Sequence, residues 1–363
     1  MTFGIDNLPY GSVVDRSGRR MAVVRFSDAV LDLTRLDAPL FAAGDLDAFL
    51  AAGPDTWARV RAAAQELLAR GTVELVPLTE VRPVLPFTVA DYVDFYASLD
   101  HATNAGRIFR PQGDPLPANW RYLPVGYHGR SSSVVVSGTP IERPAGIRAA
   151  GDYGPTERLD FEAEVAFVVG RPGRRIPVAA ADEHVFGVCL LNDWSARDVQ
   201  AFETVPLGPF LGKSFATSVA AWITPLAALA AARRPAPPQD PPPLPHLAGG
   251  TALDLELEVR INGVPISRPS FAGTYWTYAQ MLAHLTSNGA AVRTGDLFAS
   301  GTVSGPEPGQ RGCLLELTEN GAAPLDVRGE PRTWLQDGDT VTITARAGDL
   351  DLGEVSGHVV PPG

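Results

Sequence analysis

The sequence predicts a strand-rich α+β fold, made of many short strands and few helices. Segments rich in β-branched residues recur along the chain between glycine and proline turns: SSVVVSGTPI, FEAEVAFVVG, LDLELEVRING, GCLLELTENG and DTVTITARAG. Helical periodicity is confined to a few stretches between them. A doubly wound sheet needs a crossover helix after each strand, so this pattern favours a mixed, β-rich architecture instead.

The first part of the chain, residues 1–86, is predicted to form a small separate domain. Residues 12–34 contain short alternating apolar runs around turn signals, which favours short strands. Helices are predicted at residues 45–53 and 55–70, the second with Asp55 as its N-cap. A proline-punctuated stretch follows, and we place the domain boundary at its end.

The remaining residues, 87–363, are predicted to form one large domain that contains most of the strands. Helical patterns appear there at residues 180–186, 193–203 and 275–287. Residues 232–250 are rich in proline, and we expect an ordered surface loop there.

Composition limits the kind of partner and the compartment. The chain has 363 residues and a formal net charge of −11, from 41 acidic and 30 basic residues. Phosphate binding needs a basic face, so we do not expect nucleic acid as a partner, although a local basic site for a small anion is compatible with this charge. We find no signal-peptide pattern and no apolar run long enough for a membrane span. The two cysteines are far apart, which argues against a disulfide framework and fits a reducing cytoplasm.

Four acidic residues stand in apolar or aromatic surroundings. Glu162 and Glu164 lie two positions apart in LDFEAEVAFVVG, where strand alternation places both on one face. A solvated strand face would explain this pair alone, but the apolar neighbours indicate burial. Asp94 lies in DYVDFYASLDH and Asp193 in VCLLNDWSARD. Such an all-oxygen set suits Ca²⁺ or Mg²⁺ better than Zn²⁺, and like charges this close cannot all be buried without a cation.

His101 is the candidate general base. It follows Asp94 by seven residues, which is close to two helical turns. Its polar neighbours are Tyr96, Asn104 and Arg110. A lone histidine is more often structural than catalytic, but this density of polar groups favours a histidine that removes a proton from water.

Further candidates follow in the second half of the chain. Asp193, Arg197 and Gln200 are spaced so that a helix would place them on one face. A surface ion-pair stripe would explain this spacing, but at a strand-to-helix junction Arg197 and Gln200 could hold a developing oxyanion. LGPFLGKSF lacks the first glycine of a P-loop, which leaves Lys213 as a surface lysine or as a cation beside a bound anion. Glu316 is one more acid inside a predicted apolar strand.

Longer motifs run in order along nearly the whole chain. They are GIDNLPYG, DYVDFYASLDHATNAGRIFR, LPVGYHGRSSSVVVSGTPI, NDWSARDVQ, PLGPFLGKSF and SGTVSGPEPG. Together they resemble the motifs of the fumarylacetoacetase (fumarylacetoacetate hydrolase) family, with the weakest coverage at residues 35–80 and in the proline-rich loop. The resemblance implies an SH3-like β-barrel for residues 1–86, a mixed β-roll catalytic domain for residues 87–363, and assembly as a homodimer.

The resemblance also implies a role for each candidate residue. Ligands of Ca²⁺ or Mg²⁺ are implied at Asp94, Glu162, Glu164 and Asp193. A second cation is implied near Lys213 and Thr217. A general base and its carboxylate partner are implied at His101 and Glu316. Groups around the oxyanion are implied at Arg197, Gln200 and Lys213, and substrate contacts at Tyr96, Arg110, Tyr127, Gln200 and Thr302.

The activity that the resemblance implies is hydrolysis of a carbon–carbon bond. The substrate would be 4-fumarylacetoacetate, a doubly anionic β-diketone, cleaved to fumarate and acetoacetate in the last step of tyrosine and phenylalanine catabolism. Thr204 stands where the family motif has a tyrosine that contacts substrate, so the exact specificity stays open. The alternatives are a related acylpyruvase, hydratase or decarboxylase of the same superfamily, and a non-catalytic homologue that binds a ligand.

Overall fold

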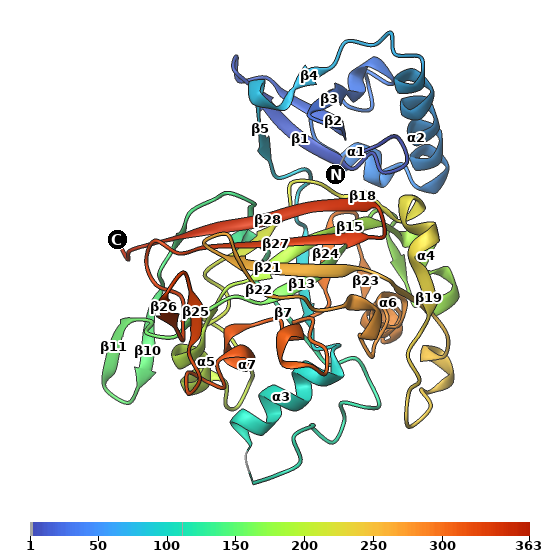
Figure 1. The fold of residues 1–363 in the computed structure, drawn as a ribbon. Coiled ribbons are helices and arrows are strands. Elements are labelled where there is room, and N and C mark those ends of the chain that lie inside the picture. The colour runs from blue at the N-terminus through green and yellow to red at the C-terminus, as the bar shows by residue number, and fades with distance from the viewer. Residues whose placement is uncertain (1–2, 111) are drawn as a thin grey trace.

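The N-terminal part of the chain is a small five-stranded antiparallel sheet with two helices beside it (Figure 1). The computed structural model describes residues 3–110 and 112–363, so the first two residues of the predicted first domain lie outside it. The sheet has the strand order β4-β3-β2-β1-β5 and curls into half a barrel. Its strands are β1 (Tyr10–Asp15), β2 (Arg20–Phe26), β3 (Ala29–Asp32), β4 (Val76–Pro77) and β5 (Val81–Val84).

Two helices, α1 (Asp47–Ala51) and α2 (Pro54–Ala69), are inserted between β3 and β4. The prediction of Asp55 as N-cap was wrong, because α2 begins at Pro54 with Gly53 as its N-cap. Proline suits the first helical position, where its missing N–H costs nothing and its φ angle is already helical. Asp55 lies in the first turn, where the helix dipole favours a carboxylate.

The larger part is built on a mixed eight-stranded sheet, with the order β7-β6-β24-β13-β15-β17-β8 and β18 paired to β15. Its strands are β6 (Asp91–Phe95), β7 (Gly126–His128), β8 (Val134–Val136), β13 (Ala163–Val169), β15 (Val185–Asp193), β17 (Thr217–Val219), β18 (Thr224–Pro225) and β24 (Asp296–Ala299). Every residue of the central strands β13 and β15 is buried. A strand covered on both faces has apolar residues at nearly every position, and this explains why AEVAFVV and VFGVCLL are almost entirely apolar.

A second five-stranded sheet, in the order β22-β21-β27-β28-β9, packs through β28 onto β15 and β17 of the first. It consists of β9 (Ile141–Glu142), β21 (Glu256–Ile261), β22 (Val264–Ser267), β27 (Thr340–Ala347) and β28 (Leu350–Val360). Buried and half-buried residues alternate along β27, as expected for a strand with one face on the core. These two sheets confirm the predicted strand-rich class.

Shorter elements surround the sheets (Figure 1). The helices are α3 (Leu99–Phe109), α4 (Ala181–His184), α5 (Arg197–Glu203), α6 (Tyr278–Ser287) and α7 (Leu314–Leu317). The remaining strand pairs are β10 (Ala145–Ala149) with β11 (Asp152–Pro155), β12 (Leu159–Asp160) with β16 (Ser195–Ala196), β14 (Gly173–Arg174) with β23 (Ala291–Val292), β19 (Arg233–Pro235) with β20 (Thr251–Leu253), and β25 (Leu325–Val327) with β26 (Glu330–Arg332). None of the described helices is long and apolar enough to cross a membrane.

Three local predictions were wrong. GCLLELTENG was predicted as a strand, but its centre is the helix α7. Residues 193–203 were predicted as one helix, but Asp193 ends β15, where it pairs with Thr217 of β17, and α5 begins only at Arg197. Asp94 and His101 do not share a helix, because Asp94 lies on β6 and His101 on α3. In each case contacts with distant segments override the local pattern.

Candidate metal centre and catalytic site

The four acidic residues of the sequence prediction lie together at one end of the large sheet. Asp94 comes from β6, Asp193 from the end of β15, and Glu164 from β13, with Glu162 directly before that strand. One carboxylate oxygen of each residue lies within 4.8 Å of those of the other three. β6, β13 and β15 belong to one sheet, which brings together residues that are up to 99 positions apart (193 − 94). The predicted convergence of two glutamates on one face is confirmed by this cluster.

Burial makes this cluster electrostatically unfavourable by itself. All four residues are at most 5% exposed. Burial, and next the charge of Asp193, raises the pKa of Asp94 well above its usual value, and burial with Asp94 does the same for the pKa of Glu164. Burial also raises the pKa of Asp193. Burial acts in the same direction on Glu162, but Lys213 and Arg197 outweigh it and hold the pKa of that carboxyl below its usual range.

Two oxygens of the cluster, Asp94 Oδ1 and Glu164 Oε1, are buried without a hydrogen-bond partner among the described residues. A buried acceptor that makes no hydrogen bond costs roughly 1–3 kcal/mol. The backbone N–H of Gly301 supplies the other Glu164 oxygen with a bond of 3.2 Å. Gly301 has φ +74°, and a Cβ there would meet the Phe95 carbonyl oxygen at 2.0 Å, so only glycine brings the backbone this close. A hard divalent cation fits this donor set, because it would bind the free oxygens and offset the repulsion.

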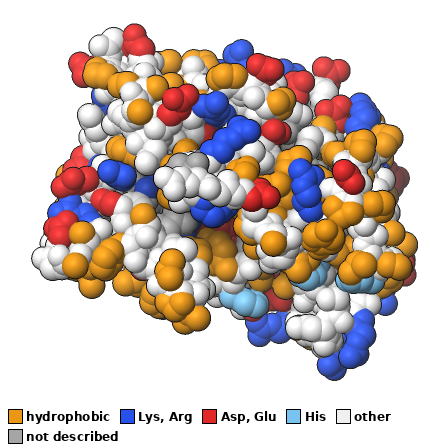
Figure 2. All heavy atoms as spheres, turned by 90° about the horizontal axis from the view of Figure 1, so that it is seen from below, with side chains coloured by type: hydrophobic (Ala, Val, Ile, Leu, Met, Phe, Trp, Pro, Cys, Tyr) orange, Lys and Arg blue, Asp and Glu red, His pale blue; other side chains and the backbone are white. Residues whose placement is uncertain are grey.

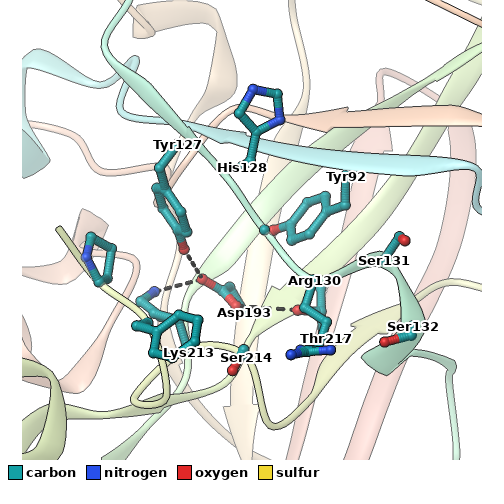
Figure 3. Close-up of a pocket in the computed structure, with 13 residues that line it drawn as sticks. Tyr92, Tyr127, His128, Arg130, Ser131, Ser132, Asp193, Lys213, Ser214 and Thr217 are labelled. Carbon is teal, nitrogen blue, oxygen red and sulfur yellow. Dashed lines mark hydrogen bonds and ion pairs between the residues drawn. The ribbon is translucent and has the colours of Figure 1, made fainter. Parts of the chain in front are cut away.

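Lys213 lies between two members of the cluster. Its Nζ pairs with Glu162 and, at 2.6 Å, with Asp193 Oδ2. Figure 3 shows that the Asp193 carboxylate also accepts bonds from the Tyr127 and Thr217 hydroxyls, each at 3.3 Å. The view looks into a cavity of about 340 Å³ that Asp193 and Thr217 line. That Lys213 and Thr217 lie near a second cation stays a prediction.

A histidine–glutamate pair lies beside the acidic cluster. His101 Nδ1 is 2.6 Å from Glu316 Oε2, and both side chains are buried. Glu316 also accepts hydrogen bonds from Asn104 at 2.9 Å, from Ser304 at 2.8 Å and from the Cys313 thiol at 3.2 Å. Burial opposes ionisation of Glu316, but His101, Asn104 and Ser304 lower its pKa to about 2. An ionised Glu316 holds Nδ1 protonated, which leaves Nε2 of His101 to accept a proton.

Arg197 connects the cluster to neighbouring groups through all three of its guanidinium nitrogens. Nη2 donates to Glu162 at 2.7 Å and Nη1 to the Gln200 side-chain oxygen at 3.1 Å. Nε donates to Asp160 Oδ2 at 2.8 Å. Burial opposes the charge of Arg197, but Glu162 and Asp160 outweigh it and raise the pKa of the guanidinium well above its usual value.

These groups surround one cavity of about 700 Å³. The predicted site residues that line it are Asp94, Tyr96, His101, Arg110, Tyr127, Glu162, Arg197, Gln200, Lys213 and Thr302. Glu164, Asp193, Thr217 and Glu316 are not among its lining residues. The Thr302 hydroxyl is buried without a partner in the described part of the chain. Figure 2 looks onto the face that carries α3, where hydrophobic and basic side chains border a hollow.

Sequence reasoning missed three residues of the site: Asp160, Ser304 and Cys313. The sequence contains a pattern that includes Asp160, because Asp160, Glu162 and Glu164 alternate with other residues in LDFEAE, each two positions from the next. Alternation alone therefore predicts three acids on one face. Ser304 and Cys313 had no such signal, because only tertiary contacts bring them to Glu316.

Comparison with known proteins finds the same family along nearly the whole chain. The family described as "Fumarylacetoacetase N-terminal" matches residues 6–86, and "Fumarylacetoacetate (FAA) hydrolase C-terminal" matches residues 91–360. The chain is 42% identical over 403 residues to a fumarylacetoacetase of Arabidopsis thaliana and 43% identical over 403 residues to that of Homo sapiens. Both alignments cover 99% of this chain and 96% of the relative.

Solved structures share the fold at lower identity. A fumarylacetoacetate hydrolase from Exiguobacterium antarcticum is 21% identical with a TM-score of 0.62, covering 98% of this chain and 99% of that one. A maleylpyruvate hydrolase from Sphingobium sp. SYK-6, in complex with manganese(II) ion and pyruvate, is 17% identical with a TM-score of 0.60, covering 98% and 100%. Fold, site and relatives together define a hydrolase with a carboxylate metal centre. The chain belongs to the fumarylacetoacetate hydrolase family.

Proposed function

We propose that this protein hydrolyses the carbon–carbon bond of 4-fumarylacetoacetate to give fumarate and acetoacetate. The observation that carries the proposal is the 2.6 Å contact between His101 and Glu316, because His101 lines the same cavity as Asp94 and Glu162 of the acidic cluster. A general base next to a site for a divalent cation is the arrangement that hydrolysis of a β-diketone needs. The curated fumarylacetoacetases, aligned over nearly their full length, support this choice of substrate.

Water activation depends on His101. Nε2 accepts a proton from water, and the resulting hydroxide forms a bond to the ketone carbon next to the fumaryl group. Glu316 stabilises the imidazolium through Nδ1. When the carbon–carbon bond breaks, its electron pair leaves with the acetoacetate carbon, which then receives the proton that His101 holds. No covalent intermediate with the protein is needed.

Charge develops on the ketone oxygen as water attacks. Arg197 and Lys213 carry positive charge in the wall of the cavity, and Gln200 lies next to Arg197. Cations and donors that are already in place lower the barrier, because they need no reorganisation when the oxyanion forms. We assign these three residues to the oxyanion.

The cation would be held by Asp94, Glu162, Glu164 and Asp193. When bound there, Mg²⁺ or Ca²⁺ supplies Lewis acidity toward the oxygens of the diketone. The mixture of free and partnered oxygens in the cluster supports a single hard cation.

The substrate's carboxylate and keto groups would contact polar residues that line the cavity. Tyr96 meets the His101 ring edge-on, with 5.2 Å between the ring centroids, so it borders the reacting centre. Arg110 supplies the positive charge for a carboxylate, and Tyr127 and Thr302 line the same cavity. Thr204 also lines the cavity, but its hydroxyl donates to the Gln200 carbonyl at 2.6 Å. We therefore assign no substrate contact to this hydroxyl.

We propose that the chain forms two domains, residues 1–86 and 87–363, since the two family matches divide at residues 86–91.

We also propose that the protein is a homodimer in the cytoplasm that serves tyrosine and phenylalanine catabolism. A strongly exposed apolar loop supports a partner subunit, because Val205 is 84% exposed and Leu207 97%.

A substrate panel tests the proposed function. We expect purified protein with Mg²⁺ or Ca²⁺ to convert 4-fumarylacetoacetate to equal amounts of fumarate and acetoacetate. Its kcat/KM should exceed that for an acylpyruvate, for oxaloacetate and for a hydratable dienoate by at least about 100-fold. A higher value for one of these would assign the related activity instead, and binding without turnover would indicate a non-catalytic homologue.

Arg110→Met tests the carboxylate contact. A hydrogen bond to a charged group contributes about 1.5–3 kcal/mol, so we expect KM for 4-fumarylacetoacetate to rise about 10- to 100-fold. Arg107→Met is the matched control, because Arg107 does not line the cavity and is exposed in the last turn of α3, which ends directly before the C-cap residue Arg110. Equal KM values for the two variants in steady-state kinetics would contradict the assignment.

A further inference from the structure

We propose that Asp160 is a positioning residue that ties Arg197 to the helix carrying Glu316. The inference rests on the proposed function, since it assigns a role within that same site. Asp160 is completely buried and is absent from the lining of the cavity, so it does not touch the substrate. Its effect on the reaction would pass through the two groups that it holds.

The first group is α7. Leu314 N–H donates to Asp160 Oδ1 at 2.7 Å, and Leu315 N–H donates to Oδ2 at 3.0 Å. These are the first two residues of α7, and the next residue is Glu316. The helix has no cap of its own, because the side chain of Cys313, its N-cap residue, makes no capping bond. Asp160 therefore takes the place of an N-cap from 154 positions away in the chain.

The second group is the Arg197 guanidinium. Nε donates to Asp160 Oδ2, so the plane of the guanidinium is set on that side. Its two other nitrogens then point at Glu162 and Gln200. A planar group held at Nε has little freedom to rotate, which directs its remaining N–H groups.

The strand that carries Asp160, β12, lies between α7 and the segment that carries Arg197. β12 pairs with β16, with Asp160 opposite Ser195, and α5 with Arg197 starts directly after β16. Two residues after Asp160, Glu162 forms an isolated antiparallel β-bridge with Cys313, the residue directly before α7. One carboxylate thus sets the spacing between the base-orienting Glu316 and the oxyanion group Arg197. A displacement of about 1 Å in such a site can cost about 100-fold in rate.

The competing explanation is that Asp160 only stabilises the fold. Asp339 offers a matched control, because it is 2% exposed and also accepts bonds from a backbone N–H and an arginine. It accepts hydrogen bonds from Gln336 N at 2.8 Å, from Arg332 Nε at 3.2 Å and from Asn262 Nδ2 at 2.8 Å. Asp339 does not line the cavity. Asp160→Asn and Asp339→Asn are therefore comparable in burial and in the bonds they weaken.

We expect Asp160→Asn to lower kcat about 100-fold while KM changes less than about threefold, because the substrate contacts remain. Asp339→Asn should lower the unfolding temperature but leave kcat within about twofold of the wild type. Equal kcat losses in both variants, or a wild-type kcat in Asp160→Asn, would overturn the inference.

A second measurement does not require activity. The proton on His101 Nδ1 lies in a 2.6 Å contact with Glu316 and should give a downfield NMR signal, assigned by its absence from His101→Ala. We expect Asp160→Asn to shift or broaden this signal and Asp339→Asn to leave it in place. If wild-type protein fails to cleave 4-fumarylacetoacetate, the proposed function fails, but this signal still tests Asp160. An unchanged signal in Asp160→Asn overturns the inference in either case.

Asp160→Glu covers the case in which the asparagine variant does not fold. It keeps the charge but displaces the carboxylate by one methylene, so folded protein should show the same altered signal and a reduced kcat. A wild-type signal together with wild-type kcat in the glutamate variant would overturn the inference.

Discussion

Replacing His101 by alanine is expected to lower kcat for 4-fumarylacetoacetate by about 10²- to 10⁴-fold, the range that a general base contributes. The imidazole lines the substrate cavity, Glu316 lies 2.6 Å from its Nδ1, and none of the other histidines in the described part of the chain lines that cavity. Loss of the ring removes the group that accepts the water proton. Steady-state kinetics at saturating substrate measures the effect directly.

Two further variants make this result specific. His101→Asn keeps a hydrogen-bond donor for buried Glu316 but has no basic nitrogen, so it should fold better than the alanine variant and be as inactive. His284→Ala removes a half-buried histidine on α6, outside the cavity, and should keep kcat within about twofold. Activity within about tenfold of the wild type in folded His101→Asn would exclude His101 as the base.

Removal of the divalent cation is expected to abolish hydrolysis, and addition of Mg²⁺ or Ca²⁺ to restore it. The cluster of Asp94, Glu162, Glu164 and Asp193 is buried and self-repelling, and two of its oxygens have no partner in the described residues. A cation that binds only the folded state also stabilises that state, by about 2.7 kcal/mol at a free concentration 100 times Kd. Chelation should therefore lower the unfolding temperature as well as the rate, and calorimetry with a kinetic assay measures both.

Glu164→Gln separates the cation from a general loss of structure. Without cation, this variant should be more stable than the wild type, because it removes one of the like charges in a site that strongly disfavours them. It should no longer gain stability or activity from Mg²⁺ or Ca²⁺. Glu258→Gln, on β21 and outside the site, should respond to the cation as the wild type does. A chelator without effect on wild-type rate and unfolding temperature would remove the reason for the carboxylate cluster.

Most of the site could be predicted from the sequence because its residues carry local signals. Glu162 and Glu164 alternate inside an apolar strand, and a buried carboxylate needs a partner wherever it lies. Asp94 and Asp193 stand in similar settings, which suggested an all-oxygen site for a hard cation, and the resemblance to the family implied that the four carboxylates converge. The polar residues around His101 indicated the base, and the resemblance added its partner Glu316 and the substrate contacts.

The errors at residues 313–317 and at Asp193 share one physical origin, which is dependence on distant contacts. CLLEL is as compatible with a strand as with a helix, and it becomes α7 because Asp160 accepts the N–H groups of Leu314 and Leu315. Asp193 ends a strand rather than starting a helix because β17 pairs with it. Neither partner is visible within a local window of sequence.

The strand-rich class, the family and the kinds of group in the site can be read from the amino-acid sequence. They follow from periodicity, side-chain chemistry and motifs, which are properties of short segments. How the groups meet depends on the folded chain, because the order β6-β24-β13-β15 joins strands that are not neighbours in the chain. That order places Asp94 close to Glu164 and Asp193, and the separate pairing of β12 with β16 brings the Asp160 carboxylate within reach of both Arg197 and α7.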